Sequence, residues 1–398
     1  MKKQPKCRSL ILKVASRCNL NCSYCYMYNA GDSTYQYQPA AMSKQIVEAV
    51  LIKVKAHCKK HKLKHFDFIF HGGEPLLLPK QFYIDFVAKA DETLRPEIIP
   101  HYSLQTNGTL LSVEWCKLLA SLNIRLGVSL DGTAETNDRV RVDHRGKGSY
   151  HRIVKGLNTA LQTSSYGFRP GLLCVIDPTS DPIATYNQLK NLSDTISFLL
   201  PYATYEHPPK DLTKSATPYA DWLIAIYDQW IQQSHKPQIR IFQQIMELIL
   251  GIDRGFEYLG STKNEFLVIE TDGGIEAAGA LKVCGEGFTK AGMNILSDQL
   301  DDALQTDLIQ LYYLSHHRLS RKCRLCSIKK ICGGGYLPHR FRKKNGFDNP
   351  SVFCQDLMRL IAHIQNSLIS MLSEEIVKQS GLIPLDYSLL KAYADLDV

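Results

Sequence analysis

The chain has 398 residues, of which 44% are apolar and 22% charged, enough to bury a substantial core and to form two or three domains. No stretch approaches the roughly 18 consecutive apolar residues of a membrane span, and no apolar signal core follows the basic N-terminus. We therefore expect a cytoplasmic protein with no membrane partner. The net charge of +8 suits an acidic partner or merely a solvated surface, and no nucleic-acid-binding signature accompanies it.

The first half of the chain alternates short β-branched or aromatic runs with helical stretches, a pattern typical of strand-helix units around a parallel sheet. Helix start signals lie at Ser43, Ser112, Ser149 and Asp181, the last followed by a proline at the first helical position. The strands are predicted at residues 10–14, 66–70, 102–105, 125–129, 172–176 and 196–200. Six units predict an α/β fold that is too short for a closed eight-fold barrel.

Three cysteines follow the first predicted strand at a short, fixed spacing. Cys18, Cys22 and Cys25 place three thiolates on one loop, which suits three corners of a cubane iron-sulfur cluster and leaves the fourth iron open. Twelve cysteines in a reducing compartment argue against a disulfide framework, and their clustering favours metal binding.

Polar or glycine-rich segments follow the next three predicted strands. They are residues 71–75 (His-Gly-Gly-Glu-Pro), 106–109 (Thr-Asn-Gly-Thr) and 129–132 (Ser-Leu-Asp-Gly). In parallel barrels such loops lie on one face and carry the ligand-binding residues. Glycines at 72 and 73 allow the backbone to approach a ligand, Glu74 can accept from an ammonium group, and Arg141 can pair with a carboxylate. His71 is equally well a histidine satisfied beside a strand end.

The second half is predicted to be helical over residues 217–250 with a break near Pro237, followed by a strand at 266–269 and a turn at 272–274. An amphipathic helix at about 356–375 is expected to pack back on the first half. A second cysteine group lies between these elements. Cys323, Cys326, Cys332 and Cys354 carry CxxC spacing that also suits tetrahedral zinc.

The cysteine loop and the segments that follow the strands resemble the radical SAM superfamily, and the second cysteine group resembles its SPASM domain. This resemblance implies a partial (β/α)6 TIM-like barrel at residues 1–215, a helical bridge at 216–260 and a smaller α+β SPASM-type auxiliary-cluster domain at 261–398. The implied cofactors are S-adenosylmethionine and two [4Fe–4S] clusters, one held by Cys18, Cys22 and Cys25 and one by Cys323, Cys326, Cys332 and Cys354. The implied S-adenosylmethionine contacts are Tyr24, Gly72, Gly73, Glu74, Asn107, Ser129, Asp131 and Arg141.

The chain departs from the full SPASM pattern at three positions. Tyr336 and Ala278 stand where that pattern has cysteines, so one auxiliary cluster is expected. Gly279 stands where the sulfatase-maturase branch has its catalytic Asp. Cys284 is expected to be an ordinary buried thiol, since no second cysteine lies near it.

Residues 141–150 and 332–354 look like those of the cyclophane-forming peptide maturases. This resemblance implies that a β-carbon of a ribosomal precursor peptide is joined to a nearby aromatic ring, with a flavodoxin- or ferredoxin-type protein as reductant. Glu276, a tyrosine or water would serve as the general base. The alternatives are a formylglycine-generating sulfatase maturase, another peptide chemistry such as thioether formation, and a non-catalytic zinc-stabilised binding scaffold.

Overall fold

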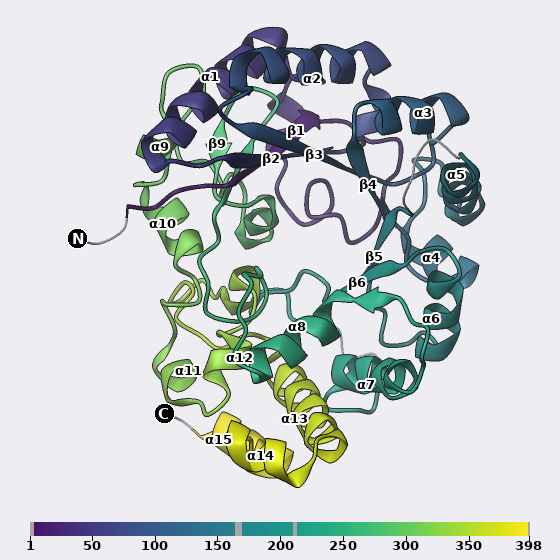
Figure 1. Ribbon diagram of the computed structural model, residues 1–398, viewed down its shortest axis with the longest axis vertical. Coiled ribbons are helices and arrows are strands. Elements are labelled where there is room, and N and C mark those ends of the chain that lie inside the picture. The colour runs from purple at the N-terminus through teal and green to yellow at the C-terminus, as the bar shows by residue number, and fades with distance from the viewer. Residues whose placement is uncertain (1–3, 164–168, 210–212, 397–398) are drawn as a thin grey trace. The chain divides into compact units, whose positions relative to one another are not determined.

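The computed structural model describes residues 4–163, 169–209 and 213–396, which pack into two compact units (Figure 1). Unit 1 comprises Met1–Leu173, Leu192–Asp194 and Glu265–Tyr313, and unit 2 comprises Cys174–Asn191, Thr195–Asn264 and Leu314–Val398. Residues 265–313 thus belong to the same unit as the N-terminal strands, although the sequence assigns them to a domain that begins at residue 261. The predicted three-domain division stays a prediction. Within the described ranges, no helix is both long and apolar enough to cross a bilayer.

Unit 1 is built on a parallel sheet, which confirms the predicted α/β class. Its strands lie in the order β5-β4-β3-β2-β1-β8-β9, and only the β8–β9 pair is antiparallel. The strands are β1 (Ser9–Ala15), β2 (His65–Gly72), β3 (Ile99–Thr106), β4 (Ile124–Ser129), β5 (Gly171–Val175), β8 (Phe266–Ile269) and β9 (Ile275–Glu276). The predicted strands are confirmed to within a few residues at each end.

The helices of unit 1 begin mostly where the sequence indicates. Ser43 and Ser112 accept hydrogen bonds from the first turns of α1 and α3, as expected of N-caps. The helix predicted at Ser149 also begins there, as α5, but the Ser149 side chain makes no cap and instead donates to the carbonyl of Arg141 at 2.6 Å. The elements are η1 (Thr34–Tyr37), α1 (Lys44–His61), η2 (Pro75–Leu77), α2 (Lys80–Leu94), α3 (Val113–Ser121), α4 (Ala134–Val140), α5 (Tyr150–Gln162), η4 (Gly279–Cys284), α9 (Leu300–Ala303) and α10 (Asp307–Tyr313).

The core of unit 1 is aromatic where β2 meets α2. Phe68 and Phe70 point from alternate positions of β2 and pack against Phe86 of α2, with ring centroids 5.4 and 4.9 Å apart. All three side chains are buried, and α1 lies beside α2 in Figure 1. Such close edge-to-face packing fixes the strand that carries the glycine-rich segment.

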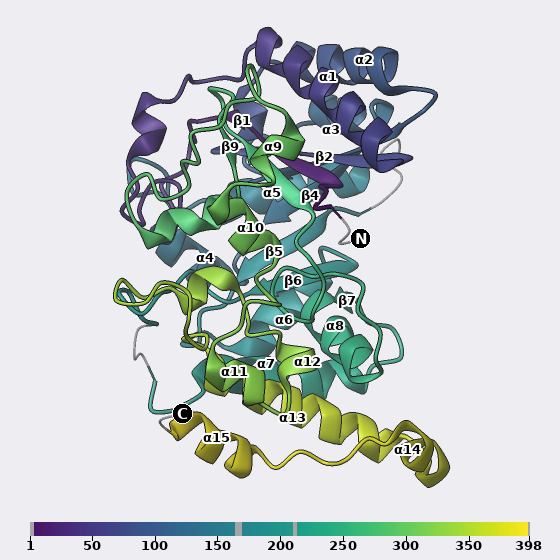
Figure 2. The ribbon, with the colours of Figure 1, turned by 90° about the vertical axis from the view of Figure 1, so that its left-hand side faces the viewer.

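Unit 2 is mainly helical. Asp181 caps α6 and Pro182 opens it, as predicted, and the predicted helical stretch divides into α7 and α8 around residues 232–237. The long C-terminal helix α13 packs on α7 and α8, and Figure 2 shows α14 and α15 following it. The elements are α6 (Pro182–Lys190), β6 (Thr195–Leu199), α7 (Pro218–Ile231), β7 (Gln238–Ile239), α8 (Arg240–Ile249), α11 (Arg321–Leu325), α12 (Lys329–Cys332), η5 (Leu337–Arg340), α13 (Cys354–Met371), α14 (Glu374–Ser380) and α15 (Tyr387–Asp395).

Candidate active site

Cys18, Cys22 and Cys25 lie on the loop that leaves β1, and each is a partly buried free thiol. Burial raises the pKa of the Cys18 thiol to about 12, and the charges of Cys22 and Cys25 act in the same direction. Burial also raises the pKa of the other two thiols. The charge of Cys22 also raises the pKa of Cys25, so a bound cluster, whose positive charge would replace the thiol protons, fits this loop.

The backbone of residues 140–144 holds this cysteine loop in place. The amides of Asn21 and Ser23 donate to the carbonyls of Val142 and Val140 at 2.7 and 2.9 Å. The ring Nε2 of His144 lies 2.9 Å from the carbonyl oxygen of Cys18. The segment 141–150 therefore fixes the geometry of the three thiols, a role that the sequence alone did not reveal.

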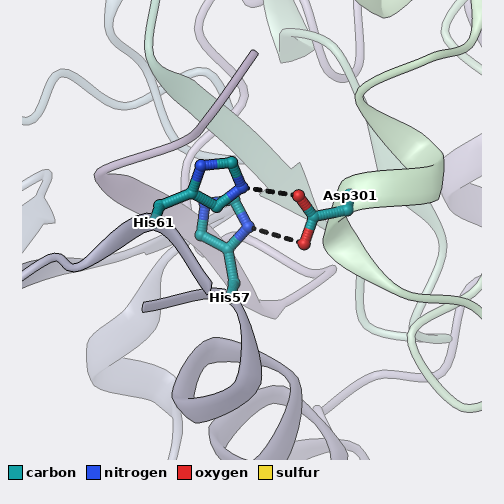
Figure 3. A group of neighbouring side chains, drawn as sticks. All are labelled: His57, His61 and Asp301. Atoms are coloured by element: carbon teal, nitrogen blue, oxygen red, sulfur yellow. Dashed lines mark hydrogen bonds and ion pairs between the residues drawn. The ribbon is translucent and has the colours of Figure 1, made fainter. Parts of the chain in front are cut away.

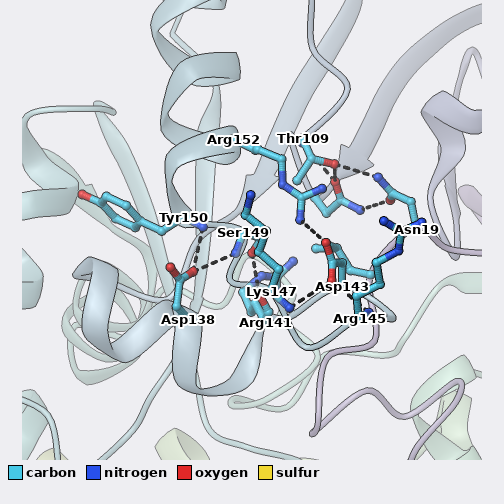
Figure 4. A network of polar contacts seen from close by, with 12 residues as sticks. Asn19, Thr109, Asp138, Arg141, Asp143, Arg145, Lys147, Ser149, Tyr150 and Arg152 are labelled. Atoms are coloured by element: carbon cyan, nitrogen blue, oxygen red, sulfur yellow. Dashed lines mark hydrogen bonds and ion pairs between the residues drawn. The ribbon is translucent and has the colours of Figure 1, made fainter.

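Segment 141–150 is itself braced by two carboxylates (Figure 4). Asp143 accepts from the amides of Arg145 and Lys147 at 3.0 Å and pairs with Arg152 at 3.1 Å. Asp138 accepts from the amides of Ser149 and Tyr150, both at 2.8 Å. These bonds satisfy backbone amides that would otherwise donate to water. Segment 141–150, which holds the cysteine loop, therefore has a defined conformation of its own.

The two glycines of the segment after β2 approach the chain itself. A Cβ on Gly73 would lie 2.2 Å from the Arg17 carbonyl oxygen and 2.1 Å from the Tyr28 hydroxyl. Gly72 has φ +137°, and a Cβ there would lie 2.2 Å from the carbonyl oxygen of Ala15. The glycines thus let β2 close on the residues that lead into Cys18. Their predicted contact with S-adenosylmethionine stays a prediction.

Gly73→Ala is expected to destabilise unit 1 by at least about 3 kcal/mol, because its new methyl group overlaps backbone that cannot move without shifting the cysteine loop. Chemical denaturation of the protein measures this loss. Gly171→Ala is the matched control, since nothing lies within 4 Å of its new methyl group and its φ is not positive. Equal unfolding free energies for the two variants would contradict the close-packing role of Gly73.

Glu74 is fully buried and ties the β2 end to the β3 end. Its carboxylate accepts from the Thr106 hydroxyl at 2.7 Å, from the Asn107 amide at 2.8 Å and from the Leu76 amide at 2.9 Å. Burial raises its pKa, and these three donors oppose the rise. The carboxylate is thus a structural brace, and its predicted contact with an ammonium group stays a prediction.

The remaining predicted contacts gather at the same strand ends. The Asn107 side chain donates to Asn19 at 2.8 Å and lies 3.7 Å from the Cys18 sulfur, and Ser129 accepts from Gln105 at 2.9 Å. The structure therefore brings the end of β3 to the cysteine loop and joins it to the end of β4, as the sequence predicts for a parallel sheet.

Tyr24, Asp131 and Arg141 form one buried hydrogen-bonded group. The Tyr24 hydroxyl donates to Asp131 at 2.6 Å and accepts from Arg141 at 2.5 Å. Among the described residues, the buried Nε of Arg141 has no hydrogen-bond partner. A buried guanidinium with a free donor is suited to a carboxylate, which accepts such a bond at short range.

Sequence reasoning missed Lys13, which is 1% exposed in the middle of β1. Its ammonium donates to the Tyr26 hydroxyl at 2.5 Å and lies 3.2 Å from Nδ1 of His71. Burial lowers the pKa of Lys13, and the nearby Glu270 opposes this. The available signal was one lysine within the apolar run Leu10–Val14. His71 also accepts from the Gly72 amide, so it is a satisfied histidine.

Glu276, the candidate general base, lies on β9 and is 1% exposed. Its carboxylate lies 3.0 Å from the Lys290 ammonium and 3.8 Å from that of Lys282. The buried carboxylate is thus paired with two ammonium groups. Its role as base stays a prediction.

The four cysteines of the second group line one cavity in unit 2, although 31 positions separate the first from the last. Cys323 lies in α11 and Cys326 caps it, while Cys332 ends α12 and Cys354 begins α13. Burial raises the pKa of Cys332 to about 12, and the charges of Cys323 and Cys326 add to this rise. The structure therefore brings together the predicted ligand set.

Two buried polar side chains fix the loop between Cys332 and Cys354. Arg340 is 1% exposed and donates to the carbonyls of Ser315, Arg318 and Phe347. Asn349 donates to the carbonyl of Arg340 at 2.9 Å. These bonds satisfy the carbonyls of Phe347 and Arg340 within the loop and tie the loop to residues 315–318.

Tyr336, at a position where the full SPASM pattern has a cysteine, pairs with Glu257. Burial raises the pKa of Glu257 to about 7, and the Tyr336 hydrogen bond and the Arg240 charge oppose the rise. Because the folded state binds this proton more tightly than the unfolded state does, stability is greatest below the unfolded pKa and falls as the pH rises towards 7.

Glu257→Gln is expected to remove this pH dependence, which amounts to about 2 kcal/mol between roughly pH 5.5 and 8.5. The measurement is urea denaturation of both proteins at the two pH values. Loss of the same free energy in both proteins would contradict the raised pKa of Glu257.

Residues 12–173 match the model of the radical SAM superfamily. Together with the sulfatase-maturating relatives, this domain match indicates a radical SAM enzyme. It is 25% identical over 372 residues to a cysteine-type anaerobic sulfatase-maturating enzyme of Clostridium novyi (strain NT), covering 88% of this chain and 93% of the relative. An enzyme of this superfamily is not the non-catalytic zinc scaffold considered above.

Two solved structures share the fold of this radical SAM enzyme. Native anSMEcpe with bound AdoMet aligns with a TM-score of 0.78 at 21% identity, covering 91% of this chain and 98% of that chain. Streptococcus suis SuiB bound to the precursor peptide SuiA aligns with a TM-score of 0.60 at 19% identity, covering 88% and 76%. The predicted fold class, a partial barrel followed by a SPASM-type region, agrees with these neighbours.

S-adenosylmethionine and [4Fe–4S] clusters are the cofactors of this radical SAM enzyme, and the thiol groups described above fit them. Among the described residues, three or more metal-binding atoms come within 4.8 Å of one another only at His57, His61 and Asp301, and at neither cysteine group.

Proposed function

We propose that this radical SAM enzyme modifies a ribosomally made precursor peptide by joining an aromatic ring carbon to a β-carbon of a nearby residue. The observation that carries this proposal is Gly279, at the position where the sulfatase-maturase branch has its catalytic Asp. A Cβ on Gly279 would lie 3.1 Å from the Tyr26 hydroxyl and 3.4 Å from the Lys13 ammonium. The Tyr26 hydroxyl and the Lys13 ammonium thus lie beside position 279, which itself carries no carboxylate.

We assign a different role to each of the two thiol groups. Cys18, Cys22 and Cys25 would hold the cluster that binds S-adenosylmethionine, and Arg141 would direct its free Nε to the carboxylate of that cofactor. When bound, the reduced cluster and S-adenosylmethionine supply a carbon radical for hydrogen abstraction. Cys323, Cys326, Cys332 and Cys354 would hold an auxiliary cluster that accepts the electron released when the ring regains aromaticity.

The proposed substrate is a peptide, and the proposed electron donor is a flavodoxin- or ferredoxin-type protein. The structural neighbour SuiB is described as bound to a precursor peptide, SuiA. The relative from Clostridium novyi is described as a sulfatase-maturating enzyme, whose name implies a protein substrate. The net charge of +8 suits an acidic electron carrier or acidic peptide, whose approach it would accelerate.

Formylglycine formation is the second candidate, and it is favoured by the nearly full-length match to a sulfatase-maturating enzyme. That reaction oxidises a serine or cysteine side chain to an aldehyde. Gly279 counts against it, because the chain then needs another group to take the substrate proton.

Co-expression with the short open reading frames that neighbour its gene, followed by mass spectrometry, tests the proposal. Ring closure and serine oxidation both remove two hydrogens, so mass alone does not separate them. A crosslinked product resists fragmentation inside its ring and does not react with a hydrazide, whereas formylglycine fragments normally and forms a hydrazone. A hydrazide-reactive product would overturn crosslinking in favour of formylglycine.

A further inference from the structure

A group of two histidines and one aspartate lies in unit 1, apart from both thiol groups. His57 and His61 are four residues apart near the end of α1, so that both rings project from one face of the helix. Asp301 reaches them from α9, and Figure 3 shows its carboxylate facing both rings. One ligand atom from each of the three residues lies within 4.8 Å of the other two.

In the structure, Asp301 holds this group together by hydrogen bonds (Figure 3). Its two oxygens lie 3.2 Å from Nδ1 of His57 and 2.6 Å from Nε2 of His61. The ammonium of Lys60 also lies 3.2 Å from one oxygen, but half of the Lys60 side chain is exposed. The lysine can therefore turn to solvent without a large desolvation change, and a cation of higher charge can take its place.

Nε2, the ring nitrogen of His57 that does not face Asp301, lies near two backbone groups of Cys7. It lies 3.1 Å from the amide nitrogen of Cys7 and 3.1 Å from the carbonyl oxygen of the same residue. Nε2 therefore has a partner in either neutral tautomer of the ring. With the proton on Nε2, the ring donates to the Cys7 carbonyl and directs the lone pair of Nδ1 at Asp301. A bond from the outer ring nitrogen to a carbonyl is the usual support of a metal-binding histidine.

We propose that His57, His61 and Asp301 bind one divalent transition-metal ion of the zinc class, through Nδ1, Nε2 and one carboxylate oxygen. Two imidazoles and a carboxylate form a donor set that zinc uses, with water in the fourth position. The ion would join α1 to α9 and, through His57, to the start of β1. This site is independent of the proposed function, because it involves neither group of thiols.

The test uses anaerobically reconstituted protein with its clusters loaded, so that the cysteines are not free to take up metal. Titration with Zn²⁺ followed by calorimetry is expected to show one equivalent bound and a rise in the melting temperature of unit 1. His61→Gln and Asp301→Asn are each expected to weaken binding by at least about 100-fold. Lys60→Met is expected to strengthen it several-fold, because it removes the competing ammonium group.

His65→Gln is the matched control. His65 lies on the surface of the same unit, with its Nδ1 3.0 Å from Nε2 of His101, so this variant is expected to bind Zn²⁺ as the wild type does. X-ray absorption at the zinc edge is expected to show nitrogen and oxygen ligands only. Sulfur ligands, the absence of a stoichiometric site, or equal binding by wild type and His61→Gln would each overturn the proposal. His61 is the last residue of α1, so the helix is expected to form in the His61→Gln variant as well.

Discussion

Replacement of Cys18, Cys22 and Cys25 together by alanine is expected to abolish the release of 5′-deoxyadenosine from S-adenosylmethionine. The three thiols lie on one loop whose backbone is held by residues 140–144, and no other cysteine lies in this loop. We expect the rate to fall by at least about 1000-fold. The measurement is chromatography of reactions supplied with dithionite in the absence of oxygen.

Iron content separates loss of the cluster from loss of the fold in this experiment. The triple variant is expected to keep about four of about eight irons, because the second thiol group in unit 2 is unchanged. Cys116→Ala is the control, since Cys116 is a buried thiol of α3 outside both groups. Wild-type release of 5′-deoxyadenosine by the triple variant would contradict the assignment of these thiols.

Cys354→Ala is expected to block formation of the modified peptide while leaving some cleavage of S-adenosylmethionine uncoupled from product. Cys354 begins α13 and faces the other three thiols of its group, so its loss opens one corner of the auxiliary cluster. The cluster that cleaves S-adenosylmethionine is held by other residues and remains. The two products are counted in the same reaction, the peptide by mass spectrometry and 5′-deoxyadenosine by chromatography.

The control for this second variant is Cys284→Ala. Cys284 is a buried thiol at the end of η4 and is expected to be an ordinary core residue, so its loss is expected to leave iron content and product yield unchanged. Product at normal yield from a Cys354→Ala protein with one cluster would refute the role of the auxiliary cluster. Loss of iron from Cys284→Ala would instead show that Cys284 is a ligand.

The local features of the fold were readable from the sequence. The strands begin and end close to the predicted positions, and the caps at Ser43, Ser112 and Asp181 form as expected, because these features depend on neighbouring residues. Ser149 differs because its hydroxyl donates to the carbonyl of Arg141, eight residues away, and does not cap the helix. A cap is predictable only where no distant partner offers a better hydrogen bond.

The partners of buried polar groups were not readable. In the sequence, Lys13 interrupts an apolar strand without an evident partner. The structure shows that its ammonium group contacts Tyr26 and His71. Gly72 and Gly73 suggest a ligand, yet their close contacts are with residues Ala15, Arg17 and Tyr28 of the same chain. The roles of these residues follow from which segments meet, and sequence spacing says nothing of that.

By itself the sequence determined the two thiol groups, the order of strands and helices and the class of chemistry, because short-range spacing sets ligand geometry and periodicity sets secondary structure. Only the tertiary structure decided which loops brace the cysteines and that His57 meets Asp301, 244 positions away. Contacts at such separation arise from the packing of the whole unit. Many sequences with the same local pattern would place different residues there, so the pattern does not specify them.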